Sequence, residues 1–280
     1  MRIDKFLQNS EDKLQTAGIG TARLDALILL EDSLHKDRAW LLAHPEFEIA
    51  KSYLDRLKKQ LVRRASHEPL AYVRGHTEFY GRKFKVNKRV LEPRPESETM
   101  IDLLKEIINH KPRTNNYELK IADVGTGSGA IGITTALELH NHNVDLFDID
   151  ASALAVAKHN CALHELHLRT VKRDLLRNSH KAYDVILANL PYVPTHFRIN
   201  PAAAREPRIA IFGGRDGLEV YRRLFEQLTH FSWRPVYVFT ETMPPQHQEL
   251  ENIAKNAGFK QKTSQDFIQC FTILEARNPE

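Results

Sequence analysis

The chain has 280 residues and a formal net charge of +4, with 42% apolar and 27% charged residues. This balance is typical of a folded globular protein and excludes a disordered chain. The small net charge does not demand a nucleic-acid partner, and no apolar run approaches the length of a membrane-spanning helix.

Residues 1–70 have a helical pattern. Leucine and isoleucine recur at steps of three and four residues between polar faces, at Leu24, Leu27, Ile28, Leu34, Leu54, Leu57 and Leu61. This pattern predicts a small helical bundle, which we assign to a first domain at residues 1–75. Its basic segment is interpreted first as a solvated helix face and second as a docking surface for RNA or an acidic protein. That segment contains Lys58, Lys59, Arg63 and Arg64.

Residues 77–91 alternate apolar and polar side chains around a glycine and an asparagine, which predicts a hairpin within a connector at residues 76–95. From Ile121 onward, segments typical of strands alternate with segments typical of helices. The predicted strands are 119–124, 144–149, 167–174, 183–189, 236–241 and 267–276, and the predicted helices are 129–140 and 151–165. This order predicts an α/β domain at residues 96–280, with a mostly parallel sheet, helices on both faces and an antiparallel edge.

A glycine-rich loop follows the first predicted strand, with Gly125, Gly127 and Gly129. Glycine adopts positive φ angles at little cost and lets a ligand approach the backbone. Open α/β sheets bind ligands at such a loop. Because the loop continues to Ala130 with dinucleotide-binding spacing, it fits both a nicotinamide-dependent oxidoreductase and a methyltransferase.

Acidic residues lie at the ends of the first two strands of this domain. Asp148 ends the second strand about 20 residues after the first glycine, where a carboxylate suits the ribose hydroxyls of an adenosine ligand. Asp150 either competes for that role or caps the next helix. Asp123 is either oriented by the glycine loop or faces the cation of a bound ligand.

The chain leaves the strand at 183–189 through Asn189, Leu190, Pro191 and Tyr192. Pro191 holds Leu190 in an extended conformation, so the Leu190 carbonyl has no helical partner. The Asn189 side-chain oxygen and that carbonyl are then two acceptors for one NH2 group, and Tyr192 offers a flat face to a planar amide or base. This arrangement suits methylation of a conjugated nitrogen by a methyl sulfonium, with no metal or nucleophilic cysteine.

Cys161 and Cys270 lie far apart, without CxxC or Cys/His spacing. Neither a disulfide framework nor a metal site is therefore expected. The charged N-terminal segment predicts neither export nor membrane insertion, and we expect a cytoplasmic protein.

Taken together, these residues resemble the release-factor glutamine methyltransferases, the PrmC/HemK family. Besides the DVGTGSG and NLPY motifs, the resemblance rests on residues 68–86, 91–98 (LEPRPESE) and 206–224, and it spans nearly the whole chain. It implies a helical substrate-recognition domain joined by a hairpin to a Rossmann-like domain that uses S-adenosylmethionine and leaves S-adenosylhomocysteine. The implied substrate is the Gln of the Gly-Gly-Gln motif in class I peptide chain release factors.

The resemblance also implies site residues. The cofactor-binding residues would be Gly125, Thr126, Gly127, Ser128, Gly129, Asp148, Leu175 and Asn189. Among these, the glycine loop would line the methionine moiety, Asp148 would hold the ribose and Leu175 would flank the adenine. The catalytic and glutamine-binding residues would be Asn189, Leu190, Pro191 and Tyr192. Arg94, Pro95 and Glu96 would cover the cofactor from the connector side.

Leu190 departs from the family's usual Asn-Pro-Pro-Tyr. Leucine keeps the backbone carbonyl but has a free φ angle and an additional N–H group. Because Asn-Leu-Pro-Tyr is also similar to the motif of ribosomal RNA adenine dimethyltransferases, an adenine amino-methyltransferase acting on RNA or DNA is the alternative. A non-catalytic binding module descended from a methyltransferase is a further one. For the leading hypothesis we expect a monomer without stable nucleic-acid binding.

Overall fold

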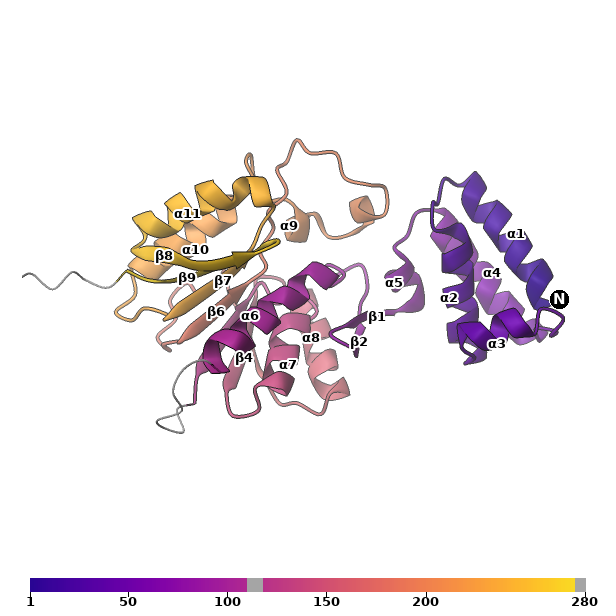
Figure 1. Cartoon of the computed structure of the whole chain (residues 1–280), viewed down its shortest axis with the longest axis horizontal. Helices are drawn as coiled ribbons and strands as arrows, with labels where there is room; N and C mark the ends of the chain where they lie inside the picture. Colours follow the sequence, from indigo (N-terminus) through magenta and orange to yellow (C-terminus); the bar gives the residue numbers. More distant parts are fainter. Residues whose placement is uncertain (110–117, 275–280) are drawn as a thin grey trace, which may run out of the picture. The chain divides into compact units, whose positions relative to one another are not determined.

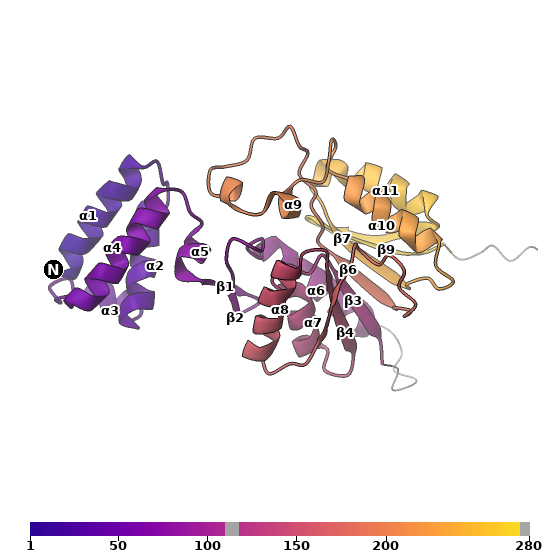
Figure 2. The same ribbon diagram turned by 180° about the vertical axis from the view of Figure 1, so that it is seen from behind.

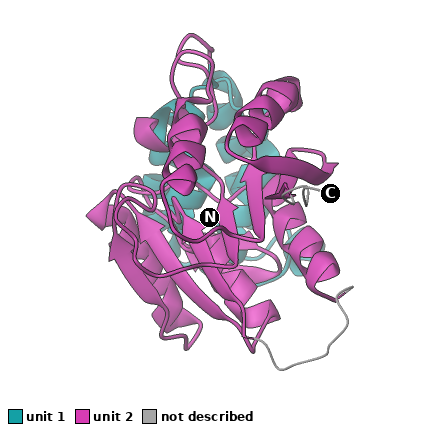
Figure 3. Ribbon diagram, turned by 90° about the vertical axis from the view of Figure 1, so that its left-hand side faces the viewer, with its two compact units in different colours: residues 1–76, 199–206 teal, residues 77–198, 207–280 magenta. Residues whose placement is uncertain are grey.

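The computed structural model of the chain describes residues 1–109 and 118–274. Its contacts divide the chain into two compact units, which Figure 1 shows as ribbons and Figure 3 in two colours. One unit contains residues Met1–His76 with Ile199–Glu206, and the other contains Thr77–Arg198 with the chain from Pro207 onward.

The first unit is built from short helices around one apolar core. They are α1 (Ile3–Thr16), α2 (Ala22–Leu34), α3 (Arg38–Ala43), α4 (Lys51–Ala65) and α5 (Leu70–Arg74), with the 3-10 turn η2 (Ala203–Arg205). Leu14, Leu30 and Leu57 are fully buried in this core. Helix α3 is capped by Asp37, whose carboxylate accepts the Trp40 N–H at 2.7 Å. The predicted helical N-terminal part is confirmed.

Two side chains of this unit differ from the predicted pattern. Leu24, counted in the apolar stripe, is 42% exposed. Arg64, counted in the basic face, is buried, and its Nε lies 2.6 Å from the Asp25 carboxylate. The basic face of α4 therefore consists of Lys58, Lys59 and Arg63, because Arg64 neutralises a buried acid.

We expect Asp25→Ala to lower the free energy of unfolding by about 3 kcal/mol, because it leaves the buried Arg64 charge without its partner. The matched control is Glu31→Ala, since Glu31 pairs with the exposed Arg38 and should cost less than about 1 kcal/mol. Urea unfolding of the whole chain measures both. Equal losses would show that burial does not strengthen the Asp25–Arg64 pair.

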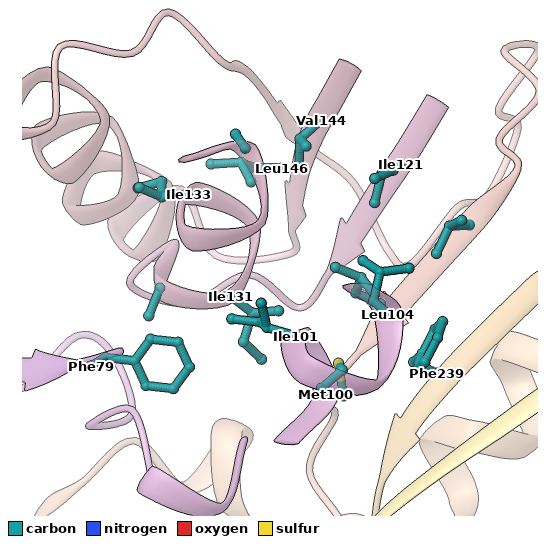
Figure 4. Close-up of a cluster of buried hydrophobic side chains, with 14 of the residues drawn as sticks. Phe79, Met100, Ile101, Leu104, Ile121, Ile131, Ile133, Val144, Leu146 and Phe239 are labelled. Atoms are coloured by element: carbon teal, nitrogen blue, oxygen red, sulfur yellow. The ribbon is translucent and has the colours of Figure 1, made fainter. Parts of the chain in front are cut away.

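The hairpin after α5 consists of β1 (His76–Phe79) and β2 (Arg82–Lys85). Its turn residues, Tyr80 and Gly81, have φ angles of 53° and 68°, as a two-residue turn of the primed type requires. Phe79 and Phe84 are buried in the core under one face of the large sheet, and Figure 4 shows Phe79 there. The hairpin is shorter than the predicted range of 77–91 and packs with the second unit.

Within the described residues, the second unit contains a seven-stranded sheet with the order β5-β4-β3-β6-β7-β9-β8. Its strands are β3 (Lys120–Val124), β4 (Asn143–Asp148), β5 (Arg169–Lys172), β6 (Val185–Ala188), β7 (Tyr237–Glu241), β8 (Phe259–Gln265) and β9 (Ile268–Ile273). Strands β3 to β7 are parallel, whereas β9 pairs antiparallel with β7 and β8. The predicted mostly parallel sheet with an antiparallel edge is confirmed; the predicted strand 267–276 extends into residues outside the described part.

Helices cover both faces of this sheet (Figures 1 and 2). Helices α6 (Glu98–Asn109), α7 (Ala130–Glu138) and α8 (Ala151–Leu163) lie on one face, and α10 (Glu219–Thr229) and α11 (His247–Asn256) lie on the other. The strands alternate accordingly: Val185 and Leu187 of β6 enter the first core, and Ile186 and Ala188 enter the second. Figure 4 shows Ile101 and Leu104 of α6 and Ile131 of α7 in the first core.

Several elements were not predicted. They are α6, α10, α11 and β8, and the short segments η1 (Pro95–Ser97), η2, α9 (Arg208–Ile211) and η3 (Pro244–Gln246). Helix α10 has a helical period in the sequence, because Leu224, Phe225 and Leu228 lie three and four residues apart and all enter the second core. Among the described helices, none combines the length and apolar character needed to cross a bilayer.

The strand order fixes where a ligand site belongs. From β3 the chain moves outward to β4 and β5, and it then returns to place β6 on the other side of β3. The direction of winding therefore reverses between β3 and β6. Open α/β sheets bind ligands in the crevice beyond the carboxyl ends of two such strands.

Candidate active site

Polar residues gather at the carboxyl edge of the parallel strands. Asp148 ends β4, Asn189 follows β6 and Glu241 ends β7, while the glycine loop follows β3. A cavity of about 230 Å³ opens at this edge. Among the residues that line it are Gly127, Asp148, Leu175 and Asn189. The structure thus brings the predicted glycine loop and the predicted strand exit together at one cavity.

The glycine loop has the backbone conformation that the sequence suggested. Gly125, Gly127 and Gly129 have φ angles of 76°, 55° and 84°. A Cβ atom on Gly127 would meet no heavy atom within 4 Å, so this glycine leaves room at the cavity wall. A Cβ atom on Gly125 would lie only 2.8 Å from Leu190 Cδ2. Gly125 therefore allows the strand exit to pack directly on the loop.

Asp123 is buried beneath this loop. One of its carboxylate oxygens accepts the Thr126 hydroxyl at 2.6 Å and the Gly132 N–H at 2.9 Å. Of its two predicted roles, the structure therefore favours orientation by the loop. Burial raises the pKa of Asp123 to about 6, although the two hydrogen bonds oppose that rise.

Asp148 and Asp150 have different surroundings. Asp148 accepts the N–H groups of Gly127 and Asp150, each at 2.9 Å, and it lines the cavity. Burial raises the pKa of Asp148. Asp150 caps α8 by accepting the Ser152 N–H at 2.7 Å, which was one of its two predicted roles, and it also lines the cavity.

At the exit from β6, each polar group has a defined partner. The Asn189 amide nitrogen donates to Ser97 Oγ at 2.9 Å. The Leu190 N–H, which a proline would lack, donates to the Tyr221 hydroxyl at 3.1 Å, and that hydroxyl donates to the Glu241 carbonyl at 2.6 Å. Replacing the usual proline by leucine therefore leaves no unpaired donor at this N–H.

Tyr192 was predicted to offer a flat face to the substrate. Its hydroxyl donates to Glu241 Oε1 at 3.1 Å, and its ring packs against the core of the second sheet face. In the part of the chain that the structure describes, Asn189, Leu190 and Pro191 line the cavity but Tyr192 does not. The Tyr192 hydroxyl is therefore directed at Glu241.

Gly213, Gly217 and Gln246 contact the backbone of the exit from β6. Cβ atoms on Gly213 and Gly217 would overlap the carbonyl oxygens of Pro191 and Tyr192, so both glycines are needed for close approach. Gln246 donates to the Tyr192 carbonyl at 2.8 Å. These glycines belong to the FGGRDGL segment, for which the sequence analysis had proposed no role.

Some of the remaining predicted site residues line the cavity and others do not. Leu175 (φ 52°), Thr126, Ser128 and Arg94 line the cavity. Pro95 and Glu96 are not among the described residues that line it.

Sequence reasoning missed Ser97, Tyr221 and Glu241. The signal for Glu241 was available, because it is a charged residue at the end of an apolar strand, like Asp148. Across residues 1–109 and 118–274, no three His, Cys, Asp or Glu side chains converge as a metal site would require.

Comparison with known proteins identifies the family. The family described as PrmC N-terminal domain matches residues 5–75, and the methyltransferase small domain matches residues 97–205. A release factor glutamine methyltransferase of Koribacter versatilis is 36% identical over 81% of this chain and 81% of its own length. Another, from Coxiella burnetii, is 30% identical over 94% of both chains. The chain belongs to the release factor glutamine methyltransferase family.

Other relatives are longer than this chain. A bifunctional methyltransferase of Rickettsia bellii is 33% identical over 92% of this chain but only 51% of its own length, so this chain spans about half of it. The solved catalytic domain of hMettl16, in complex with a MAT2A 3′UTR hairpin, has a TM-score of 0.55 at 14% identity, over 86% of this chain and 94% of that one. That likeness concerns the fold alone. The predicted family and Rossmann-like fold are confirmed, and the adenine methyltransferase alternative is not favoured.

The raised pKa of Asp123 predicts how stability depends on pH. The folded state holds a proton up to about pH 6, whereas the unfolded state releases it near pH 4, so the proton stabilises the fold as the pH falls. Lowering the pH from 7.5 to 4.5 should therefore raise the contribution of Asp123 to the free energy of unfolding. The change in the wild type should be about 2 kcal/mol more stabilising than in Asp123→Asn, which has no carboxyl group to protonate at this position. Urea unfolding of both proteins at the two pH values measures this difference. Parallel changes in the two proteins would contradict the assignment to Asp123.

The Leu190–Tyr221 hydrogen bond predicts a coupling between the two residues. Tyr221→Phe should destabilise the protein by about 2 kcal/mol, because the buried Leu190 N–H loses its acceptor. In the Leu190→Pro background this N–H is absent, so the same change should cost about 1 kcal/mol less. Thermal or urea unfolding of the four proteins measures the coupling. If Tyr221→Phe cost the same free energy of unfolding in the wild-type and in the Leu190→Pro background, the Leu190–Tyr221 hydrogen bond would contribute nothing to stability.

Proposed function

We propose that this chain transfers a methyl group from S-adenosylmethionine to the side-chain nitrogen of the Gln in the Gly-Gly-Gln motif of class I peptide chain release factors. One observation carries the proposal: two acceptor oxygens, the Asn189 side-chain oxygen and the Leu190 carbonyl, lie at the strand exit that packs on the glycine loop. The names of the Koribacter versatilis and Coxiella burnetii relatives, which this chain matches over most of their length, support the same substrate.

The residues of the cavity fit S-adenosylmethionine. Gly127 leaves open space at the wall, Asp148 lines the cavity at the end of β4, and Leu175 supplies an apolar side chain. A ribose hydroxyl is a donor for Asp148, and the adenine is a flat apolar surface for Leu175. When bound, this cofactor supplies an electrophilic methyl group on a sulfonium sulfur.

Asn189 and Leu190 orient the substrate nitrogen. Neither the Asn189 side-chain oxygen nor the Leu190 carbonyl has a hydrogen-bond donor within the described residues. Accepting both protons of a glutamine NH2 group would hold its nitrogen in place and direct its lone pair at the methyl carbon. S-adenosylmethionine would supply the methyl group and leave as S-adenosylhomocysteine, while Asn189 and Leu190 would hold the nitrogen that gains the methyl group and gives up one amide proton.

The first unit has a proposed role in substrate recognition. We assign this role to residues 1–75, the connector to residues 76–95 and the methyltransferase domain to residues 96–280. The family match at residues 5–75 supports a separate N-terminal domain. A monomeric state and a cytoplasmic location belong to the same proposal.

Asn189→Ala tests the proposed site. The change removes one acceptor for the substrate, so kcat should fall about 100-fold while the Kd for S-adenosylmethionine changes less than about twofold. Transfer of a labelled methyl group to a purified release factor measures kcat, and calorimetry measures cofactor binding. An unchanged kcat would show that Asn189 does not hold the substrate.

The substrate itself is tested with the wild-type protein. A release factor should be labelled, whereas its Gln-to-Ala variant in the Gly-Gly-Gln motif and bulk RNA should not. Labelled RNA with an unlabelled release factor would favour the adenine methyltransferase instead. Cofactor binding without transfer to any release factor would favour a non-catalytic module, and stabilisation by NAD would favour an oxidoreductase.

A further inference from the structure

Four polar side chains from three separate segments form one hydrogen-bonded chain at the proposed substrate site, and two of them, Ser97 and Asn189, line the cavity. Ser97 Oγ donates to Glu241 Oε2 at 2.5 Å, and the Tyr192 hydroxyl donates to Glu241 Oε1 at 3.1 Å. Ser97 Oγ also accepts the Asn189 amide nitrogen at 2.9 Å. We call Ser97, Asn189, Tyr192 and Glu241 the Glu241 network.

Glu241 sets the direction of every bond in this network. An ionised carboxylate only accepts hydrogen bonds, so the single Ser97 hydroxyl proton points toward Glu241. Ser97 then has only lone pairs to offer Asn189. Asn189 must therefore turn its NH2 group toward Ser97, which leaves its side-chain oxygen for the cavity that Asn189 lines.

This direction matters because an Asn side chain has two orientations of nearly the same shape. Rotating the amide by 180° exchanges the oxygen and the NH2 group without changing the space that it fills. In the rotated state, an NH2 group would meet the NH2 group of the substrate, and two donors repel. Packing alone does not separate the two orientations, whereas the Glu241 network does.

We propose that Glu241 and Ser97 are positioning residues that fix the amide of Asn189, so that its oxygen rather than its NH2 group meets the substrate nitrogen. The inference rests on the proposed function, because it assigns the substrate an NH2 group. Both residues act through Asn189.

The surroundings of Glu241 agree with positioning rather than proton transfer. Its side chain is 1% exposed, both carboxylate oxygens accept hydrogen bonds, and it is not among the described residues that line the cavity. Burial raises the pKa of Glu241, while the hydrogen bonds that Ser97 and Tyr192 donate to its carboxylate favour the ionised form. The donors that surround it thus stabilise the charge that directs the network.

The backbone of Glu241 holds the second acceptor group. Its carbonyl accepts the Tyr221 hydroxyl at 2.6 Å, and that hydroxyl accepts the Leu190 N–H at 3.1 Å. The Asn189 side chain and the Leu190 peptide are therefore both tied to the end of β7. Because both are tied to Glu241, the Asn189 side-chain oxygen and the Leu190 carbonyl are held in fixed positions relative to each other.

The test measures Ser97→Ala and Glu241→Gln in the wild-type and Asn189→Ala backgrounds. With Asn189 present, each change should lower kcat for a release factor about tenfold, with the Kd for S-adenosylmethionine changed less than about twofold. With Asn189→Ala, each change should lower kcat less than about twofold, because no amide remains to be oriented. Equal losses in both backgrounds, or no loss in either, would overturn the inference.

Thr240→Val is the matched control for a purely structural effect. Thr240 is a fully buried neighbour on β7 whose hydroxyl donates to the Gln269 carbonyl at 3.3 Å, outside the Glu241 network. This variant should lower the Tm and leave kcat unchanged. If Thr240→Val lowered kcat as much as Glu241→Gln, the effect of Glu241 would be structural and the inference would be wrong.

A direct measurement separates this inference from the proposed function. In labelled wild-type protein without substrate, the Asn189 side-chain amide protons should show nuclear Overhauser effects to the Ser97 Hβ protons, and these should weaken in Glu241→Gln. Their absence in the wild type would overturn the inference whatever the activity. Failure of the wild type to methylate any release factor would instead contradict the proposed function.

Discussion

The packing of Leu190 on Gly125 joins the two halves of the site. It exists because the strand order places β3 and β6 side by side, so that the glycine loop and the strand exit emerge at the same edge. A Cβ atom on Gly125 would lie 2.8 Å from Leu190 Cδ2 and 3.8 Å from the Asn189 carbonyl oxygen, so the loop and the strand exit are in direct contact. The glycine loop and the exit from β6 therefore meet at one close approach beside the cavity.

Two buried carboxylates organise the groups around this contact. Asp123 holds the glycine loop through a hydroxyl and a backbone N–H, and Glu241 holds the strand exit through two hydroxyls. Desolvation disfavours both charges, which is the largest cause of their raised pKa values. The protein thus accepts a cost in stability at the site, where the carboxylates fix the direction of neutral donors.

The sequence predicted the parts of the fold that local pattern determines. Glycines after a strand and prolines after another identified the loop and the exit, and alternating apolar segments identified the sheet. The pattern did not show that Arg64 is buried, since only the partner Asp25, 39 residues away, reveals it. The Ser97–Glu241 bond joins residues 144 positions apart, so it depended on the strand order. Helix α10 is different: its period was present in the sequence and was overlooked.

The hydrogen bond between the Leu190 N–H and Tyr221 has a consequence for motion. Leu190 lies outside every helix and strand, yet its amide is buried and bonded to a fully buried hydroxyl. We therefore expect its hydrogen to exchange with solvent as slowly as the backbone amides of the core strands. In its protection from exchange, the chain just beyond β6 should behave as a continuation of the strand.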